Sequence, residues 1–297
     1  MNRREFLAAA ALPAAATGAR FTKSICSVIF PQGTPLPECF RRAKDAGFDA
    51  IEIRMADEVS LDSTPDQMKQ LADDARKNGI AIASMWVSKP LSDTPINSPD
   101  PAVRAQGVAA LEKCIGLAHH AGCGALLIYS ARLGAGPKFQ IGSQDTWDRV
   151  SEAFRKVIPT AQRAKVILTP ENVSNKFLLS PLEMRSFVDQ FESPWLQTHF
   201  DTGNVMPYGY PQDWILTLGS RIRRVHVKDY KLTTRAGQGG PAGLLEGDVD
   251  WKAVMAALVK VDYRGYLSPE IGHDKNDPNQ LKKVSQALDK ILAMAPS

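Results

Sequence analysis

Four side chains that can bind a metal ion stand at the ends of predicted strands. Each follows or closes a short apolar run typical of a buried strand, and the four are Glu171, Asp201, His226 and Glu270. Three carboxylates that converge on one site would repel one another, and burying them is costly unless a cation compensates their charge. A single such residue would be an ordinary salt bridge at the rim of a sheet. Four at the same height in successive strands indicate a divalent-metal site.

Three oxygen ligands and one imidazole favour Mn²⁺ or Mg²⁺, and Zn²⁺ or Co²⁺ could substitute. Such an ion would polarise a substrate carbonyl, so that Glu171 or Glu270 could remove the neighbouring proton. Lys228 lies two residues after His226 and therefore faces the same side, where it would help to stabilise an ene-diolate. Reprotonation from the opposite face would give an epimer, whereas loss of a β-leaving group would give a dehydrated or cleaved product.

Further polar and aromatic side chains are candidates for substrate contact. These candidates are Glu52, Arg54, Trp86, Arg132, Asn204 and His273. Packing in the barrel interior or salt bridging at its rim is the alternative for the first four. Asp229 or a backbone carbonyl is expected to hold the second ring nitrogen of His226. His199 is expected to be a hydrogen-bonded core histidine, and His119 and His120 are expected to lie on the surface at the end of a helix.

The elements that must position these residues alternate regularly. Eight strands are predicted, and they are Ser24–Phe30, Ala50–Arg54, Ile80–Val87, Ala125–Ser130, Val166–Pro170, Leu196–Asp201, Ile222–Lys228 and Tyr266–Ile271. Helical patterns fill the gaps, and Gly47, Gly79 and Gly122 stop helices just before strands. A doubly wound sheet would alternate similarly, but the count of eight predicts an α/β fold of the (β/α)₈ TIM barrel type. In such a barrel, functional residues lie at the C-terminal ends of the strands.

One segment, Gly237–Gly243, is strongly glycine-rich and follows the seventh predicted strand. We interpret it as a mobile active-site loop, although a surface connection without a role would have the same composition. It is not a phosphate-binding P-loop, because no Gly-Lys-Ser/Thr follows it.

Composition limits the classes of function. The 297 residues are 44% hydrophobic and 23% charged, which suits a globular protein with a full-sized core. The net charge is only +4 and the basic residues are dispersed, so a nucleic-acid partner is not expected. The four cysteines, which have no metal-binding spacing, are interpreted as buried hydrophobic residues, although a disulfide is open to an exported protein: Cys26, Cys39, Cys114 and Cys123.

The N-terminus differs from the rest of the chain. Arg3 and Arg4 precede a short apolar, alanine-rich stretch, which is typical of a twin-arginine export signal. We therefore expect residues 1–19 to be a signal segment, residues 20–297 to form one barrel domain, and the protein to be periplasmic. The apolar run is too short to remain as a membrane span, so none is expected in the mature form.

The chain resembles the xylose isomerase-like TIM barrel superfamily of sugar isomerases, epimerases and related lyases over essentially its whole mature length. The resemblance rests on four motifs: Pro170-Glu171-Asn172, Asp201-Thr202-Gly203-Asn204, His226-Val227-Lys228-Asp229 and Leu245-Glu246-Gly247-Asp248-Val249-Asp250-Trp251. It implies the metal quartet already identified, manganese as the ion, a sugar or keto-sugar substrate, and a homodimer or homotetramer. In ketose 3-epimerases of this family, the two glutamates also act as acid and base on opposite faces of the substrate carbon.

Three positions depart from the ketose 3-epimerase pattern. Asn204 stands where those enzymes have a substrate-binding histidine, and Phe177 and Leu232 fall near their further glutamate and arginine. The last two motifs look closer to inosose dehydratase-like enzymes and to sugar phosphate isomerase/epimerases. The sequence therefore predicts a sugar isomerase/epimerase, with a lyase or dehydratase of a keto-sugar, keto-glycoside or inosose as the alternative.

Two other classes are less compatible with the residues. Apurinic endonucleases of the same superfamily need three zinc ions and many histidines, and the chain has only five. A metal-free sugar-binding protein would have no reason to keep four mutually costly polar groups.

Overall fold

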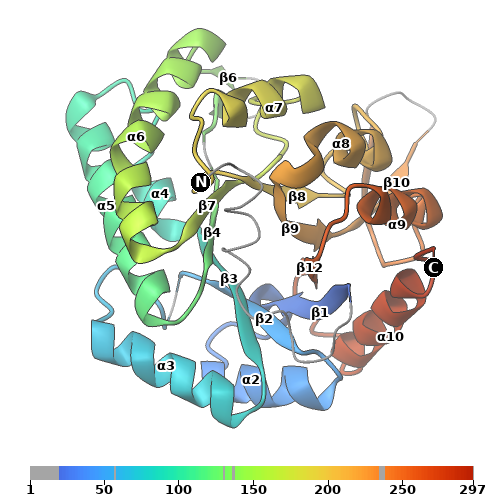
Figure 1. Ribbon diagram of the computed structural model, residues 1–297. Coiled ribbons are helices and arrows are strands. Elements are labelled where there is room, and N and C mark those ends of the chain that lie inside the picture. Colours follow the sequence, from blue (N-terminus) through green and yellow to red (C-terminus); the bar gives the residue numbers. More distant parts are fainter. Residues whose placement is uncertain (1–19, 57, 130, 136–137, 234–237, 297) are drawn as a thin grey trace.

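A closed barrel of eight parallel strands forms the centre of the computed structural model (Figure 1). The structure describes residues 20–296, except 57, 130, 136–137 and 234–237. The predicted twin-arginine segment lies outside the described residues. In order around the sheet, the strands are β7 (Ile167–Pro170), β4 (Ala125–Ile128), β3 (Ala81–Val87), β2 (Ala50–Arg54), β1 (Phe21–Cys26), β12 (Gly265–Pro269), β9 (Ile222–Val227) and β8 (Thr198–Asp201).

Parallel bridges between Leu168 and Leu196 and between Glu171 and His199 join β7 to β8 and close the ring. The prediction of a single (β/α)₈ barrel is therefore confirmed. Closure places the C-terminal ends of all eight strands around one mouth.

Helices surround the strands (Figure 1). The principal ones are α2 (Leu36–Asp45), α3 (Pro65–Lys77), α5 (Pro101–His120), α6 (Ser143–Ala164), α7 (Pro181–Asp189), α8 (Pro211–Leu218), α9 (Trp251–Lys260) and α10 (Gln280–Leu292). The short elements are α4 (Lys89–Asp93) and two 3-10 turns, η1 (Ser27–Ile29) and η2 (Gly219–Arg221). No helix of the described residues is long and apolar enough to cross a membrane.

Local signals position the helix ends. Thr64 begins α3 with a reciprocal capping box to Gln67, and Ser180 accepts a hydrogen bond from the Glu183 amide at the start of α7. Gly47 and Gly79 have positive φ angles of 90° and 63°, a conformation that favours glycine after a helix.

The strand ends were predicted less accurately. The first strand ends at Cys26 rather than Phe30, and the last ends at Pro269 rather than Ile271. Residues 27–29 form a 3-10 turn, yet Ile29 and Phe30 remain buried. The apolar residues of this segment therefore correctly indicated burial. They did not distinguish a strand from the buried turn that follows it.

Two hairpins lie outside the barrel sheet. One pairs β5 (Gly134–Ala135) with β6 (Lys138–Phe139), and the other pairs β10 (Asp229–Leu232) with β11 (Gly239–Ala242). The described part of the glycine-rich segment is therefore not a loop without regular structure, because it pairs antiparallel to β10. A Cβ atom at Gly239 would collide with the Lys231 carbonyl, so glycine allows this close approach.

The predicted role of the cysteines as small buried residues is confirmed. All four are buried and none forms a disulfide. Burial raises the pKa of the Cys114 thiol to about 12, which favours the protonated, unreactive form.

Candidate active site

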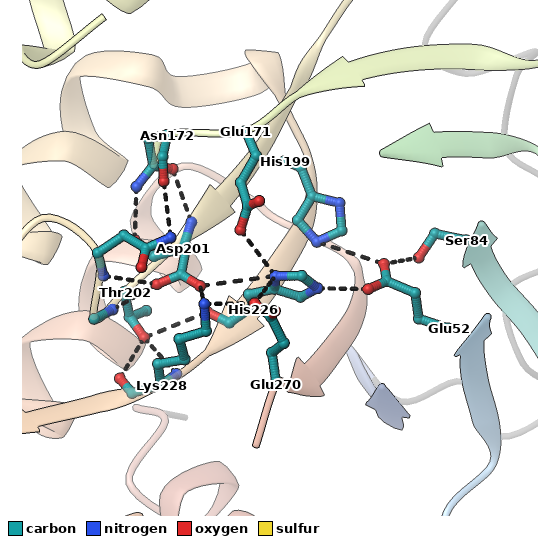
Figure 2. A network of polar contacts seen from close by, with 12 residues as sticks. Glu52, Ser84, Glu171, Asn172, His199, Asp201, Thr202, His226, Lys228 and Glu270 are labelled. Carbon is teal, nitrogen blue, oxygen red and sulfur yellow. Dashed lines mark hydrogen bonds and ion pairs between the residues drawn. The ribbon is translucent and has the colours of Figure 1, made fainter. Parts of the chain in front are cut away.

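The four predicted ligand residues meet at the barrel mouth. Glu171 follows β7, Asp201 ends β8, His226 lies in β9 and Glu270 follows β12. One donor atom from each lies within 4.8 Å of the others. Figure 2 shows the three carboxylates turned toward one side of the His226 ring. We call these four residues the quartet.

His226 Nδ1 is the centre of the quartet. It lies 3.0 Å from Glu171 Oε1, 3.0 Å from Glu270 Oε2 and 3.7 Å from Asp201 Oδ2. The Lys228 Nζ atom lies 3.0 Å from Asp201 Oδ2 and 2.5 Å from Glu270 Oε2. The Lys228 ammonium thus faces the same carboxylates as the imidazole, as strand alternation predicts.

Burial and charge act differently on the two glutamates. Burial of Glu171 outweighs the effect of His226 and raises its pKa to about 7. Burial also disfavours the charged form of Glu270, but the positive charges of His226 and Lys228 outweigh it and lower the pKa to about 2. Two carboxyl groups with opposite shifts in one site are a common arrangement for acid–base chemistry.

The donor set fits a hard or borderline divalent cation. Asp201 Oδ1 accepts hydrogen bonds from the amides of Gly203 and Asn204, at 2.9 and 2.8 Å. Its second oxygen, Oδ2, is buried and accepts no hydrogen bond from the described residues, although Lys228 Nζ is an ion-pair neighbour. A buried carboxylate oxygen that points at three other metal-competent groups is suited to coordination.

A second cluster, of Cys26, Glu52 and His226, does not have the same character. Burial and the nearby negative charge of Glu52 hold the Cys26 pKa well above its usual value, so the thiol stays protonated. Both Glu52 oxygens already have partners. We therefore interpret Cys26 and Glu52 as residues that pack behind His226 and hold it, and not as a second metal site.

Glu52 is placed differently from the prediction. It is fully buried, and both of its carboxylate oxygens contact other side chains. Its Oε1 lies 2.7 Å from His226 Nε2, on the side of the ring away from the quartet, and Ser84 Oγ donates to Oε2 at 2.5 Å (Figure 2). In the neutral imidazole that would bind a metal, a hydrogen on Nε2 held by Glu52 would leave the Nδ1 lone pair directed at the three carboxylates.

Asp229 or a backbone carbonyl was expected to hold His226 Nε2, and this prediction was wrong, because Glu52 holds it. Its Oδ1 accepts hydrogen bonds from the Tyr230 and Val249 amides, at 2.9 and 3.2 Å. Its Oδ2 accepts from the Leu245 amide and from Trp251 Nε1, at 2.9 and 3.1 Å. Asp229 therefore anchors the segment between β11 and α9.

Asp229→Asn should destabilise the protein markedly. Asparagine replaces one acceptor oxygen with a donor, so two of four donors lose their partner, at a cost of about 2–4 kcal/mol. Urea unfolding would measure this. Asp248→Asn is the control, because Asp248 lies in the same segment but makes exposed contacts to Lys231 and Leu232. Equal unfolding midpoints for Asp229→Asn and wild type would contradict the anchoring role.

The remaining predicted contacts do not share one pocket. Arg54 and His273 line a cavity of about 260 Å³ beside the loops after β1, β2 and β12. Arg132 is exposed, lies over the Tyr129 ring and lines a separate cavity of about 280 Å³. Trp86, at the end of β3, is partly buried, and its Nε1 has no hydrogen-bond partner among the described residues.

Asn204 supports the site through hydrogen bonds. Its side-chain amide donates to the Asn172 carbonyl at 3.0 Å, while the Asn172 side chain bonds to both the backbone amide and the carbonyl of Asp201. Sequence reasoning quoted Asn172 only as part of a motif and missed this role. An amide side chain directly after a ligand residue is the signal that could have revealed it.

The predicted locations of His199 and His119 agree with the structure, but the hydrogen bond predicted for His199 does not. His199 is fully buried, but no described residue forms a hydrogen bond with its ring, and its Nε2 lies 3.8 Å from Glu52 Oε2. The expected hydrogen bond is therefore absent among the described residues. His119 is exposed at the end of α5, where Nδ1 contacts the Ala164 carbonyl at 2.8 Å.

The chain is similar in sequence to sugar epimerases. It is 27% identical over 286 residues to an L-ribulose-5-phosphate 3-epimerase of Salmonella paratyphi C, covering 93% of this chain and 97% of that protein. It is 28% identical over 282 residues to the same enzyme of Escherichia coli O1:K1 / APEC, covering 92% and 95%. These similarities support an enzyme with isomerase or epimerase activity.

Solved structures agree in fold. D-psicose 3-epimerase with D-tagatose from Clostridium cellulolyticum H10 superimposes with a TM-score of 0.76 at 20% identity, covering 93% of this chain and 100% of that chain. An L-ribulose 3-epimerase has a TM-score of 0.74 at 25% identity, covering 92% and 94%. Residues 40–291 match the xylose isomerase-like TIM barrel family, to which the chain therefore belongs.

Proposed function

We propose that this protein is a divalent-metal-dependent sugar epimerase that moves a proton at a carbon next to a carbonyl. The observation that carries the proposal is the quartet, in which Glu171 and Glu270 directly follow the outer two of four neighbouring strands, β7, β8, β9 and β12. Two carboxyl groups on either side of one site can serve opposite faces of a substrate carbon. Relatives named as sugar 3-epimerases support the same reaction class.

Glu171, Asp201, His226 and Glu270 would hold the ion, with Mn²⁺ or Mg²⁺ preferred and Zn²⁺ or Co²⁺ as substitutes. When bound, the ion supplies a Lewis acid that makes the C–H bond next to the carbonyl more acidic. Removing Mn²⁺ should therefore remove activity.

The protein's own residues complete the proton transfer. One of the two glutamates takes the proton from carbon, and the other returns a proton to the opposite face. Lys228 places its ammonium beside the same carboxylates, so it can offset the negative charge that develops on substrate oxygens. Burial of Glu171 and Asp201 excludes water, which strengthens these interactions.

A lyase or dehydratase that acts on a keto-sugar, keto-glycoside or inosose is the second candidate. Two positions favour it, because Phe177 is buried in the core and Asn204 is bonded to Asn172, so neither offers the contacts expected of a ketose 3-epimerase. A three-zinc repair site receives no support, because both candidate metal groups among the described residues share the single histidine His226.

The direct test combines metal analysis with isotope exchange. Purified protein supplemented with Mn²⁺ should contain about one ion per chain, as a single quartet requires. In D₂O it should incorporate deuterium at the carbon next to the carbonyl of a ketose. Proton NMR of the product distinguishes an epimer from an unsaturated or cleaved sugar. Absence of bound metal, or exchange that continues after chelation, would contradict the proposed mechanism.

A further inference from the structure

A polar cavity of about 260 Å³ lies among the loops after β1, β2 and β12, at the same barrel mouth as the quartet. Arg54 lies two residues beyond Glu52 on the same face of β2, and His273 lies three residues beyond Glu270. The His273 amide donates to the Val28 carbonyl at 3.1 Å, which joins the loops after β12 and β1. The cavity is therefore walled by continuations of strands that carry the site.

The walls of the cavity contain both donor and acceptor groups. Arg54 contributes a guanidinium, Glu58 a carboxylate, and Gln32 and Thr34 an amide and a hydroxyl. A sugar hydroxyl both donates and accepts hydrogen bonds, so a mixed lining suits it. A phosphate monoester only accepts at neutral pH and carries nearly two negative charges.

The start of α2 is the place in this wall where a phosphate would be expected to bind, because the first amides of a helix attract anions. The Glu58 carboxylate already occupies this position. The Leu36 amide, first in α2, lies 3.0 and 3.2 Å from the two oxygens of Glu58. A phosphate there would meet a carboxylate instead of an available amide.

We infer that this cavity binds the hydroxyl-bearing end of an unphosphorylated sugar, and that Glu58 excludes the phosphorylated counterpart. The inference rests on the proposed function, since it says where the non-reacting end of the sugar substrate binds. It predicts a substrate that differs from that of the relatives whose names include a 5-phosphate.

The test compares L-ribulose with L-ribulose 5-phosphate on the Mn²⁺-loaded full chain. Deuterium exchange gives kcat/KM for each sugar, and calorimetry gives each dissociation constant, so binding is measured even without turnover. The free sugar should be preferred about tenfold or more, as expected from repulsion between a phosphate and a nearby carboxylate.

Glu58→Gln should narrow this preference about threefold to tenfold, because glutamine still accepts from the Leu36 amide but carries no charge. Glu183→Gln is the matched control, since Glu183 accepts from the Leu179 amide near the start of α7 and does not line this cavity. The control should keep the wild-type preference.

Tighter binding or faster exchange of the phosphorylated sugar would overturn the inference and leave the proposed epimerase intact. An unchanged preference in Glu58→Gln would overturn the role of Glu58. Preferential binding of the free sugar without exchange of either sugar would support the cavity assignment and contradict the proposed reaction.

Discussion

Glu270→Gln is expected to lower the rate of deuterium exchange into substrate by about a hundredfold to ten-thousandfold, the contribution typical of a general acid or base. Glutamine has nearly the same shape but cannot take up a proton. It also removes the charge that lies 2.5 Å from Lys228 Nζ and 3.0 Å from His226 Nδ1. The loss should therefore appear in kcat, measured by NMR in D₂O.

Metal content distinguishes the two roles of Glu270. A variant that keeps one Mn²⁺ per chain but loses exchange would identify Glu270 as a proton-transfer group, whereas loss of both would identify it mainly as a ligand. Glu152→Gln is the control, because Glu152 pairs with Lys156 on the outer helix α6, away from the site. Wild-type exchange in Glu270→Gln would refute the mechanism.

Glu52→Gln is expected to weaken Mn²⁺ binding about tenfold to a hundredfold, as is typical when the partner of a ligating histidine is altered. Glu52 holds His226 Nε2 at 2.7 Å, and Ser84 Oγ holds Glu52 at 2.5 Å. Glutamine fills the same space, but its neutral oxygen is a weaker acceptor, so His226 becomes a less basic ligand and its tautomer is less firmly fixed.

Calorimetric titration with Mn²⁺ would measure this effect, and circular dichroism would establish that the variant is folded. Ser84→Ala is a milder variant for comparison. It removes only the hydrogen bond that orients Glu52, so it should weaken Mn²⁺ binding less than Glu52→Gln does. Mn²⁺ affinity equal to wild type in Glu52→Gln would show that the contact does not orient the ligand.

The alternation of strands and helices was predictable from the sequence, because local periodicity reflects which face of each element is buried. Capping residues such as Thr64 and Ser180 act through hydrogen bonds within four residues, so helix starts are also encoded locally. The quartet could be predicted for a related reason. Once eight parallel strands were counted, residues at their C-terminal ends had to share one mouth.

Only the tertiary structure assigned partners to the remaining polar residues. Glu52 lies on β2 and His226 on β9, strands that are separated around the sheet by β1 and β12 and meet only through the barrel interior. Asp229 was a plausible partner by proximity in sequence, yet the turn into β10 directs it to Trp251. The cavity lined by Arg54 and His273 likewise exists only because the loops after β1, β2 and β12 lie side by side. A local pattern records whether a side chain is buried, whereas its partner depends on how the ring of strands closes.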